Sequence, residues 1–232
     1  MNIDDMQQDL GMMQISDSFF PTGLYANSNG LESIFQNNKK ITHLEVGRII
    51  ETQLKQQIGP TDLIVMENAL KFASAKEFDK ILELDMKINS IKNIKELREA
   101  SKRSGIQLIR CVREFITDKI IEEYLKFHHT GMISGAYPVS FGLCANALGI
   151  GPQKAGLMFL YGFTVSVVGA ASRMGITQHY QAQKIIHELK PLISQIVSEC
   201  MDKSTKEIWQ FAPHLEILQM RHERMESKMF IT

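Results

Sequence analysis

Apolar residues recur every three or four positions along most of this chain, the spacing that places side chains on one face of an α-helix. The first long stripe follows Thr42, which forms a capping-box pattern with Glu45. Gly59-Pro60 predicts the end of that helix and the start of the next, and Ser74 with Glu77 offers a second capping box. No segment shows the alternation typical of a half-buried strand. The pattern predicts an all-α, single-domain bundle whose short connections make successive helices antiparallel.

The stretch from Gly131 to Ser172 is the most apolar part of the chain, and Lys154 is its one formally charged side chain. Gly149-Ile150-Gly151-Pro152 divides it, because glycine favours a helix end and proline the first turn of the next helix. The 18 uncharged residues before Arg173 reach the threshold for a membrane span. Their many small and hydroxyl side chains, and the lack of a second candidate span, favour a central apolar helix pair in a soluble core over a membrane protein.

Other helices are expected at Leu31–Phe35, Asp118–Phe127, Thr177–Leu189 and Leu192–Met201, with Pro191 separating the last two. After Pro213 the spacing of three and four returns and continues to Met229. Such an amphipathic segment either packs on the parent domain or binds in a partner's groove. We therefore predict a helical domain at residues 1–212, including an N-terminal loop motif, and a C-terminal partner-binding arm at residues 213–232.

The charge composition is balanced, with 26 Lys and Arg against 26 Asp and Glu, so no global field attracts nucleic acid or an anionic membrane. Three widely spaced cysteines predict free thiols and a cytoplasmic protein, and the N-terminal residues do not resemble a signal peptide. Residues 92–113 are the most basic region, with seven basic and two acidic side chains. This region is interpreted as a solvated helix face, with docking of an acidic protein and RNA binding as alternatives; the absence of interleaved aromatic residues argues against RNA.

Catalytic chemistry has little support in the sequence. The seven histidines form no metal-binding motif, and no nucleotide-binding loop or nucleophile elbow is present. We expect no enzymatic activity, no cofactor and no built-in metal site. The alternative is a small-molecule enzyme that uses a central apolar pocket with His179 or His187 as its base.

Several segments resemble, in order and through nearly the whole chain, the urease accessory protein UreF family. They are QISDSFFPTGLYANSNGLE (14–32), LREASKRSGIQLIR (97–110), YPVSFGLCANALGI (137–150), GFTVSVVGAASR (162–173) and MRHERMESKMFIT (220–232). The resemblance implies an all-α homodimer that is not an enzyme. It also implies binding to the accessory protein UreD, called UreH in some organisms, recruitment of the GTPase UreG, and delivery of nickel to apo-urease.

The resemblance also suggests partner-binding positions. Tyr25 matches a tyrosine of the family's dimer and complex-forming region, and Glu32 matches the acid that closes the same motif. In family members, the C-terminal arm becomes ordered when UreD binds. The matching positions in this chain are Arg221, His222, Glu223, Lys228 and Phe230.

Two departures from the family pattern affect these expectations. Lys228 stands where the family usually has arginine, so it keeps the charge and loses the planar fork for bidentate contacts. Ile176-Thr177-Gln178-His179 replaces a common P-L-G-Q, which predicts a more continuous helix in place of a proline turn. His179 is expected to be an ordinary surface or buried histidine, because isolated histidines rarely bind metal.

Overall fold

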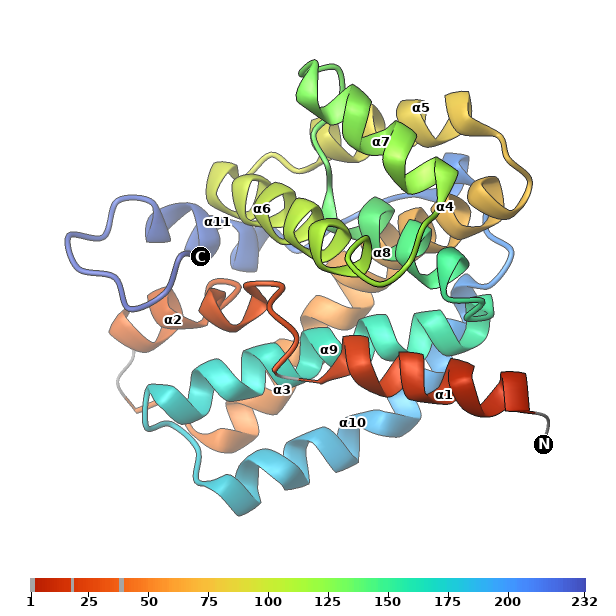
Figure 1. Cartoon of the computed structure of the whole chain (residues 1–232). Coiled ribbons are helices and arrows are strands. Elements are labelled where there is room, and N and C mark those ends of the chain that lie inside the picture. Colours follow the sequence, from red (N-terminus) through yellow and green to blue (C-terminus); the bar gives the residue numbers. More distant parts are fainter. Residues whose placement is uncertain (1–2, 18, 38–39) are drawn as a thin grey trace.

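A computed structural model describes residues 3–17, 19–37 and 40–232, with side chains from residue 6 onward. All regular structure in these ranges is helical, which confirms the all-α prediction (Figure 1). The α-helices are α1 (Ile3–Ser16), α2 (Leu31–Asn37), α3 (His43–Gln53), α4 (Ile64–Ser74), α5 (Phe78–Ile91), α6 (Lys95–Val112), α7 (Lys119–His129), α8 (Tyr137–Ala147), α9 (Pro152–Arg173), α10 (His179–Cys200) and α11 (Pro213–His222). Short 3₁₀ turns at Leu24–Ala26 (η1) and Thr205–Glu207 (η3) and a π-helix at Leu54–Leu63 (η2) complete the set.

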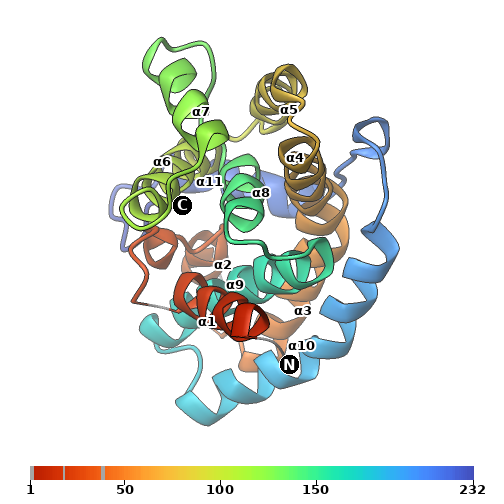
Figure 2. The ribbon, with the colours of Figure 1, turned by 45° about the vertical axis from the view of Figure 1, so that its right-hand side comes forward.

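The core lies where α8 packs between α4 and α6 and where α9 lies along α10 (Figure 2). Glycines permit the closest of these contacts. A Cβ on Gly142 of α8 would come within 2.4 Å of the Met66 carbonyl oxygen on α4, and one on Gly105 of α6 would come within 2.2 Å of the Gly135 carbonyl oxygen. The central stretch therefore does divide into a buried helix pair, as its glycine and proline positions predicted.

Helix α9 is the one helix in the described part of the chain that is long and apolar enough to cross a membrane. In this structure 56% of its most apolar window is buried inside the protein, against α10, α4 and η2. A helix with this burial has the properties of the core helix predicted from its small side chains.

The predicted break at Gly59-Pro60 is wrong, because the chain continues as one helical rod from α3 through η2 into α4. In an α-helix, Pro60 would leave the Gln56 carbonyl, four residues back, without its donor. The wider π-helix accommodates the ring, and the backbone N–H of Phe211 donates to that same carbonyl at 3.0 Å. A segment from a distant part of the sequence thus supplies an additional donor in the turn that contains the proline.

The predicted end of a helix near Pro191 is also wrong, since α10 runs from His179 to Cys200 through that residue. Pro191 is exposed, and so is His187, whose carbonyl loses its partner and can meet water. The buried stripe continues on both sides of the proline with Leu189 and Ile193. Burial of this stripe outweighs one missing hydrogen bond.

Of the two capping boxes predicted from the sequence, that of α3 forms and that of α5 does not. Thr42 accepts from the Glu45 N–H and completes the predicted capping box, and Asp118 caps the helix predicted after it. The second predicted box is wrong: Ser74 is the last residue of α4, and Glu77 precedes α5 without a side-chain cap.

The segment after Arg173 is a turn and not the continuous helix predicted from the missing proline. Gly175 adopts a φ of +73°, and the N–H groups of Gly175 and Ile176 donate to the carbonyls of Ser172 and Ala171. This pair of hydrogen bonds is the Schellman motif that ends many helices. A glycine in the left-handed conformation is enough to form it, so no proline is needed. His179 then starts α10 and is exposed.

Candidate protein interaction site

The C-terminal segment after α11 folds back onto the N-terminal loop and α2. The Ile231 N–H donates to the Ala26 carbonyl at 2.8 Å, and the Ser28 N–H donates to the Thr232 carbonyl at 3.0 Å. The Ser28 hydroxyl also donates to that carbonyl, and Thr232 is buried. The C-terminal end of the chain and the loop before α2 therefore form one surface, on the side of the molecule away from the N-terminus (Figure 1).

Glu32, in the first turn of α2, holds this segment. Its carboxylate accepts from the backbone N–H groups of Met229 at 2.7 Å and Phe230 at 3.0 Å. One of the same oxygens lies 3.1 Å from Nε2 of His222. A buried carboxylate needs such donors to replace lost water, and here three groups of the C-terminal segment supply them.

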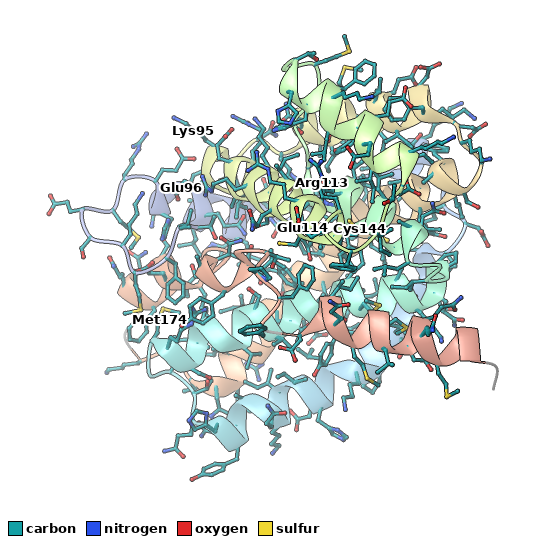
Figure 3. The ribbon with its side chains drawn as sticks, in the orientation of Figure 1. Lys95, Glu96, Arg113, Glu114, Cys144 and Met174 are labelled. Carbon is teal, nitrogen blue, oxygen red and sulfur yellow. The ribbon has the colours of Figure 1, made fainter. Side chains whose placement is uncertain are left out.

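His222, the last residue of α11, links Glu32 to Glu96. The ring is 1% exposed, and its Nδ1 lies 2.6 Å from Glu96 Oε2. The other oxygen of Glu96 accepts from Lys228 Nζ at 2.5 Å, and Lys228 also donates to the Glu223 carbonyl at 3.2 Å. Figure 3 shows Glu96 at the start of α6, on the side of the molecule where the C-terminal segment lies.

The electrostatic environment of Glu96 follows from these contacts. Burial by itself would raise the pKa of Glu96, but the hydrogen bonds from Lys228 and His222 outweigh it and lower the pKa. Glu96 therefore stays ionised at neutral pH. We call Glu32, His222, Glu96 and Lys228 the carboxylate–histidine cluster.

An arginine at the end of α9 joins the aromatic residues of both termini. The Arg173 guanidinium lies 3.6 Å from the centre of the Tyr25 ring and 4.7 Å from that of Phe230. Tyr25 is 71% exposed, whereas Phe230 is buried. The stack fixes the orientation of an exposed tyrosine without covering it.

The structure brings together most positions that the family resemblance suggested, and they divide into two groups. Glu32, His222 and Phe230 are buried and hold the segment in place. Tyr25, Arg221, Glu223 and Lys228 are exposed. Their role in partner binding stays a prediction. In this structure the C-terminal segment packs on the parent domain, which is one of the two arrangements considered for the arm.

The predicted amphipathic helix of the arm is shorter than its spacing suggested. Helix α11 ends at His222, and the methionines at 225 and 229 lie in irregular chain beyond it. The helix ends there because the backbone N–H groups of Met229 and Phe230 bind Glu32, which requires the chain to reverse direction.

Sequence reasoning missed Glu96, Arg173 and Ser28 as parts of this site. Glu96 was counted only as an acid within a basic region, and Arg173 only as the flank of an apolar run. Glu96 and Ser28 have partners more than a hundred positions away in sequence, with separations of 126 for Glu96 and His222 and 204 for Ser28 and Thr232, and Arg173 contacts Tyr25 and Phe230, which are also distant in sequence. No local pattern carries such a signal.

The histidines that the enzyme alternative would use, His179 and His187, do not line the pocket formed between η2, α6 and α9. His179 and His187 are both exposed on α10. The pocket, of about 110 Å³, is lined by apolar side chains such as Leu97 and Phe159, by several amides and by the Asp62–Lys92 ion pair at 2.7 Å, and no histidine or cysteine is among the described residues of its wall. Within the described side chains, no group of three His, Cys, Asp or Glu residues could hold a metal ion.

The comparison with protein families decides the assignment. A model of the UreF family matches residues 43–190, well over half of the chain. This chain belongs to the UreF family. The match covers α3 to α10, the helices that form the core.

Curated UreF relatives extend the similarity to both ends of the chain. The urease accessory protein UreF of Trichodesmium erythraeum is 29% identical over 97% of this chain and 97% of its own length. That of Corynebacterium efficiens is 26% identical over 98% of each chain, and UreF 1 of Brucella melitensis is 28% identical over 96% of this chain and 92% of its own. The similarity therefore includes the N-terminal loop and the C-terminal segment that form the site.

Proposed function

We propose that this protein is a non-enzymatic, cytoplasmic accessory factor that supports nickel insertion into apo-urease. Its proposed partners are UreD (UreH), the GTPase UreG and apo-urease, and its proposed state is a homodimer. The observation that carries the proposal is similarity to urease accessory proteins over nearly the whole chain. Nickel is the cargo of this process, and no residue of this chain is assigned as its ligand.

The geometry of the C-terminal segment supports a role in binding a partner. Anchoring by Glu32 holds the segment against α2 with Met229 65% exposed and Ile231 45% exposed. Tyr25 lies on the same surface and is likewise exposed. Exposed apolar side chains held on an ordered backbone are the usual anchors of an interface, because little conformational entropy is lost when they bind.

Truncation after Glu226 tests the proposal with little damage to the core. It removes Ser227–Thr232 and leaves α11, whose Leu215 and Leu218 are buried. We expect the truncated protein to keep its helical circular dichroism and to lose co-purification with UreD and UreG. A matched control, Glu226→Ala, changes an exposed side chain of the same segment and should co-purify normally.

Urease maturation provides the functional measurement. Urease activity in a strain that lacks this gene should return with the wild-type gene and with Glu226→Ala, and should not return with the truncation. Normal activity without the gene would refute the role in urease maturation. Normal partner binding by the truncated protein would refute the assignment of the C-terminal segment alone.

A further inference from the structure

A groove of about 590 Å³ runs between α6 and the loop before α2. One wall is formed by Arg103, Gln107 and Arg110 of α6, and the other by Thr22, Asn27 and Ile231. The carboxylate–histidine cluster lies at the N-terminal end of α6, in the first turn of the helix, and these arginines lie farther along it. The groove is a separate surface, although the docked C-terminal segment helps to build it.

The two arginines give this groove a positive charge that the protein does not neutralise. Arg103 and Arg110 are exposed, and neither guanidinium has a hydrogen-bond or ion-pair partner among the residues that the structure describes. The acid in the wall, Glu99, is already engaged by Lys102 at 3.0 Å. His128 adds no positive charge near neutral pH, because burial lowers its pKa.

The spacing of the arginines limits the size of the ligand. They are seven positions apart on one helix, which corresponds to a rise of about 10 Å at 1.5 Å per residue. Two anionic groups at about that spacing can therefore each meet one guanidinium group. An extended polypeptide with three residues per turn and about 3.1 Å per residue repeats side chains on one side about every 9 Å.

The side chains that line the groove favour an acidic peptide over a nucleic acid as its ligand. Single-stranded nucleic acids bind through basic side chains together with aromatic rings that stack on bases. Among the described residues, no Phe, Tyr or Trp side chain lines this groove, and its one ring is that of His128. Carboxylates, in contrast, need only the planar N–H pairs that arginine supplies.

We propose that this groove binds an acidic peptide segment of a protein partner, with one carboxylate on Arg103 and another on Arg110. The glutamine and asparagine in its walls, Gln107 and Asn27, are placed to bind the backbone of that segment. The proposal does not rest on the role in urease maturation. Its failure would leave that role unaffected.

Fluorescence anisotropy with a labelled hexaglutamate peptide tests the proposal. The full-length protein should bind the peptide, and Arg103→Glu with Arg110→Glu should weaken binding by about tenfold or more at low ionic strength. The matched control is Lys190→Glu with Lys206→Glu, which makes the same change in net charge at exposed lysines outside the groove. It should bind as the wild type does.

Competition identifies the ligand chemistry. Millimolar inorganic phosphate should leave the peptide bound, and a labelled oligo-dT strand should bind more weakly than the peptide. The proposal is overturned by absence of peptide binding, by equal loss in the control variant, by displacement with phosphate, or by tighter binding of oligo-dT. Circular dichroism of both double variants verifies that each is folded.

Discussion

The α4–α8 interface and the interface between the C-terminal segment and the rest of the protein are both buried, but different interactions stabilise them. Helices α4 and α8 meet through apolar side chains and a glycine, Gly142, whose missing Cβ lets the backbones approach. The C-terminal segment is held by hydrogen bonds to two carboxylates, Glu32 and Glu96. The first contact depends on shape, and the second depends on charge and protonation.

This difference gives the two regions different sensitivities. Overpacking at a close helix contact affects the whole fold, because the interior is densely packed and cannot relax. Loss of a carboxylate in the cluster is expected to weaken the docking of the segment from Glu223 to Thr232, and to leave the core helices in contact. A region of low local stability is suited to a surface that changes when a partner binds.

The largest effect is expected for Gly142→Ala. Its Cβ would lie 2.4 Å from the Met66 carbonyl oxygen and 2.9 Å from Ala69 Cβ, so α8 must shift away from α4. The free energy of unfolding should fall by about 3 kcal/mol, at the upper end for overpacked cores. Urea denaturation followed by circular dichroism measures it.

Gly162→Ala on α9 is the matched control, since nothing lies within 4 Å of the added Cβ. It should stabilise the protein by up to about 1 kcal/mol, because alanine is the better helix former. Equal stability of the two variants would show that α4 and α8 are less closely packed than the structure indicates.

An intermediate and local effect is expected for Glu32→Gln. One amide oxygen cannot replace two carboxylate oxygens that accept from Met229, Phe230 and His222. Breaking a buried charged network costs about 3 kcal/mol, and here that cost falls on docking of the C-terminal segment. Amide hydrogen exchange at Met229 and Phe230 should accelerate, while urea denaturation of the core changes little.

The control for this variant is Glu226→Gln, an exposed acid in the same segment. Its exchange should match that of the wild type. Continued protection of Met229 and Phe230 in Glu32→Gln would contradict the anchoring role of Glu32.

The smallest effect is a dependence of docking on pH through Glu96. Its pKa is below the ordinary value of 4.5, so its contribution to stability is complete above that pH and is lost as the pH falls through the lower folded value. The groups that face it are His222, Lys228 and Glu223. Methionine methyl NMR signals of the C-terminal segment should therefore shift toward those of a free segment in acid.

Glu96→Gln isolates this contribution. The variant should dock less completely near neutral pH and should lose part of the acid dependence seen in the wild type. Identical pH profiles for the two proteins would assign the dependence to another group.

Sequence patterns predicted the structure well where both partners of an interaction are near neighbours. Thr42 and Glu45 are three residues apart, and Asp118 caps N–H groups two and three residues ahead. The helix break at Gly149 was also local, because its N–H and that of Ile150 close onto the preceding turn. Such contacts depend on few dihedral angles and little else.

Some local predictions also failed, such as the Ser74–Glu77 capping box, and the predicted helix ends at two prolines failed for other reasons. Pro60 would end an isolated α-helix, but here the chain passes through it as a π-helix, and the distant Phe211 N–H donates to the Gln56 carbonyl in the same turn. Pro191 stays inside α10 because the buried stripe continues beyond it. A sequence window around Pro60 does not contain Phe211. Leu189 and Ile193 do flank Pro191 in the sequence, so there the rule that proline ends a helix was applied too strictly.

The sequence by itself determined the helical class, some helix starts such as those after Thr42 and Asp118, the apolar centre and the family to which the chain is similar. Only the tertiary structure decided that Glu32, His222 and Glu96 meet, and that Arg103 and Arg110 face a groove built partly by the other end of the chain. The physical reason is the range of the interactions. Periodicity and capping act within a few residues, whereas burial brings a carboxylate and its donors together only after the whole chain has folded.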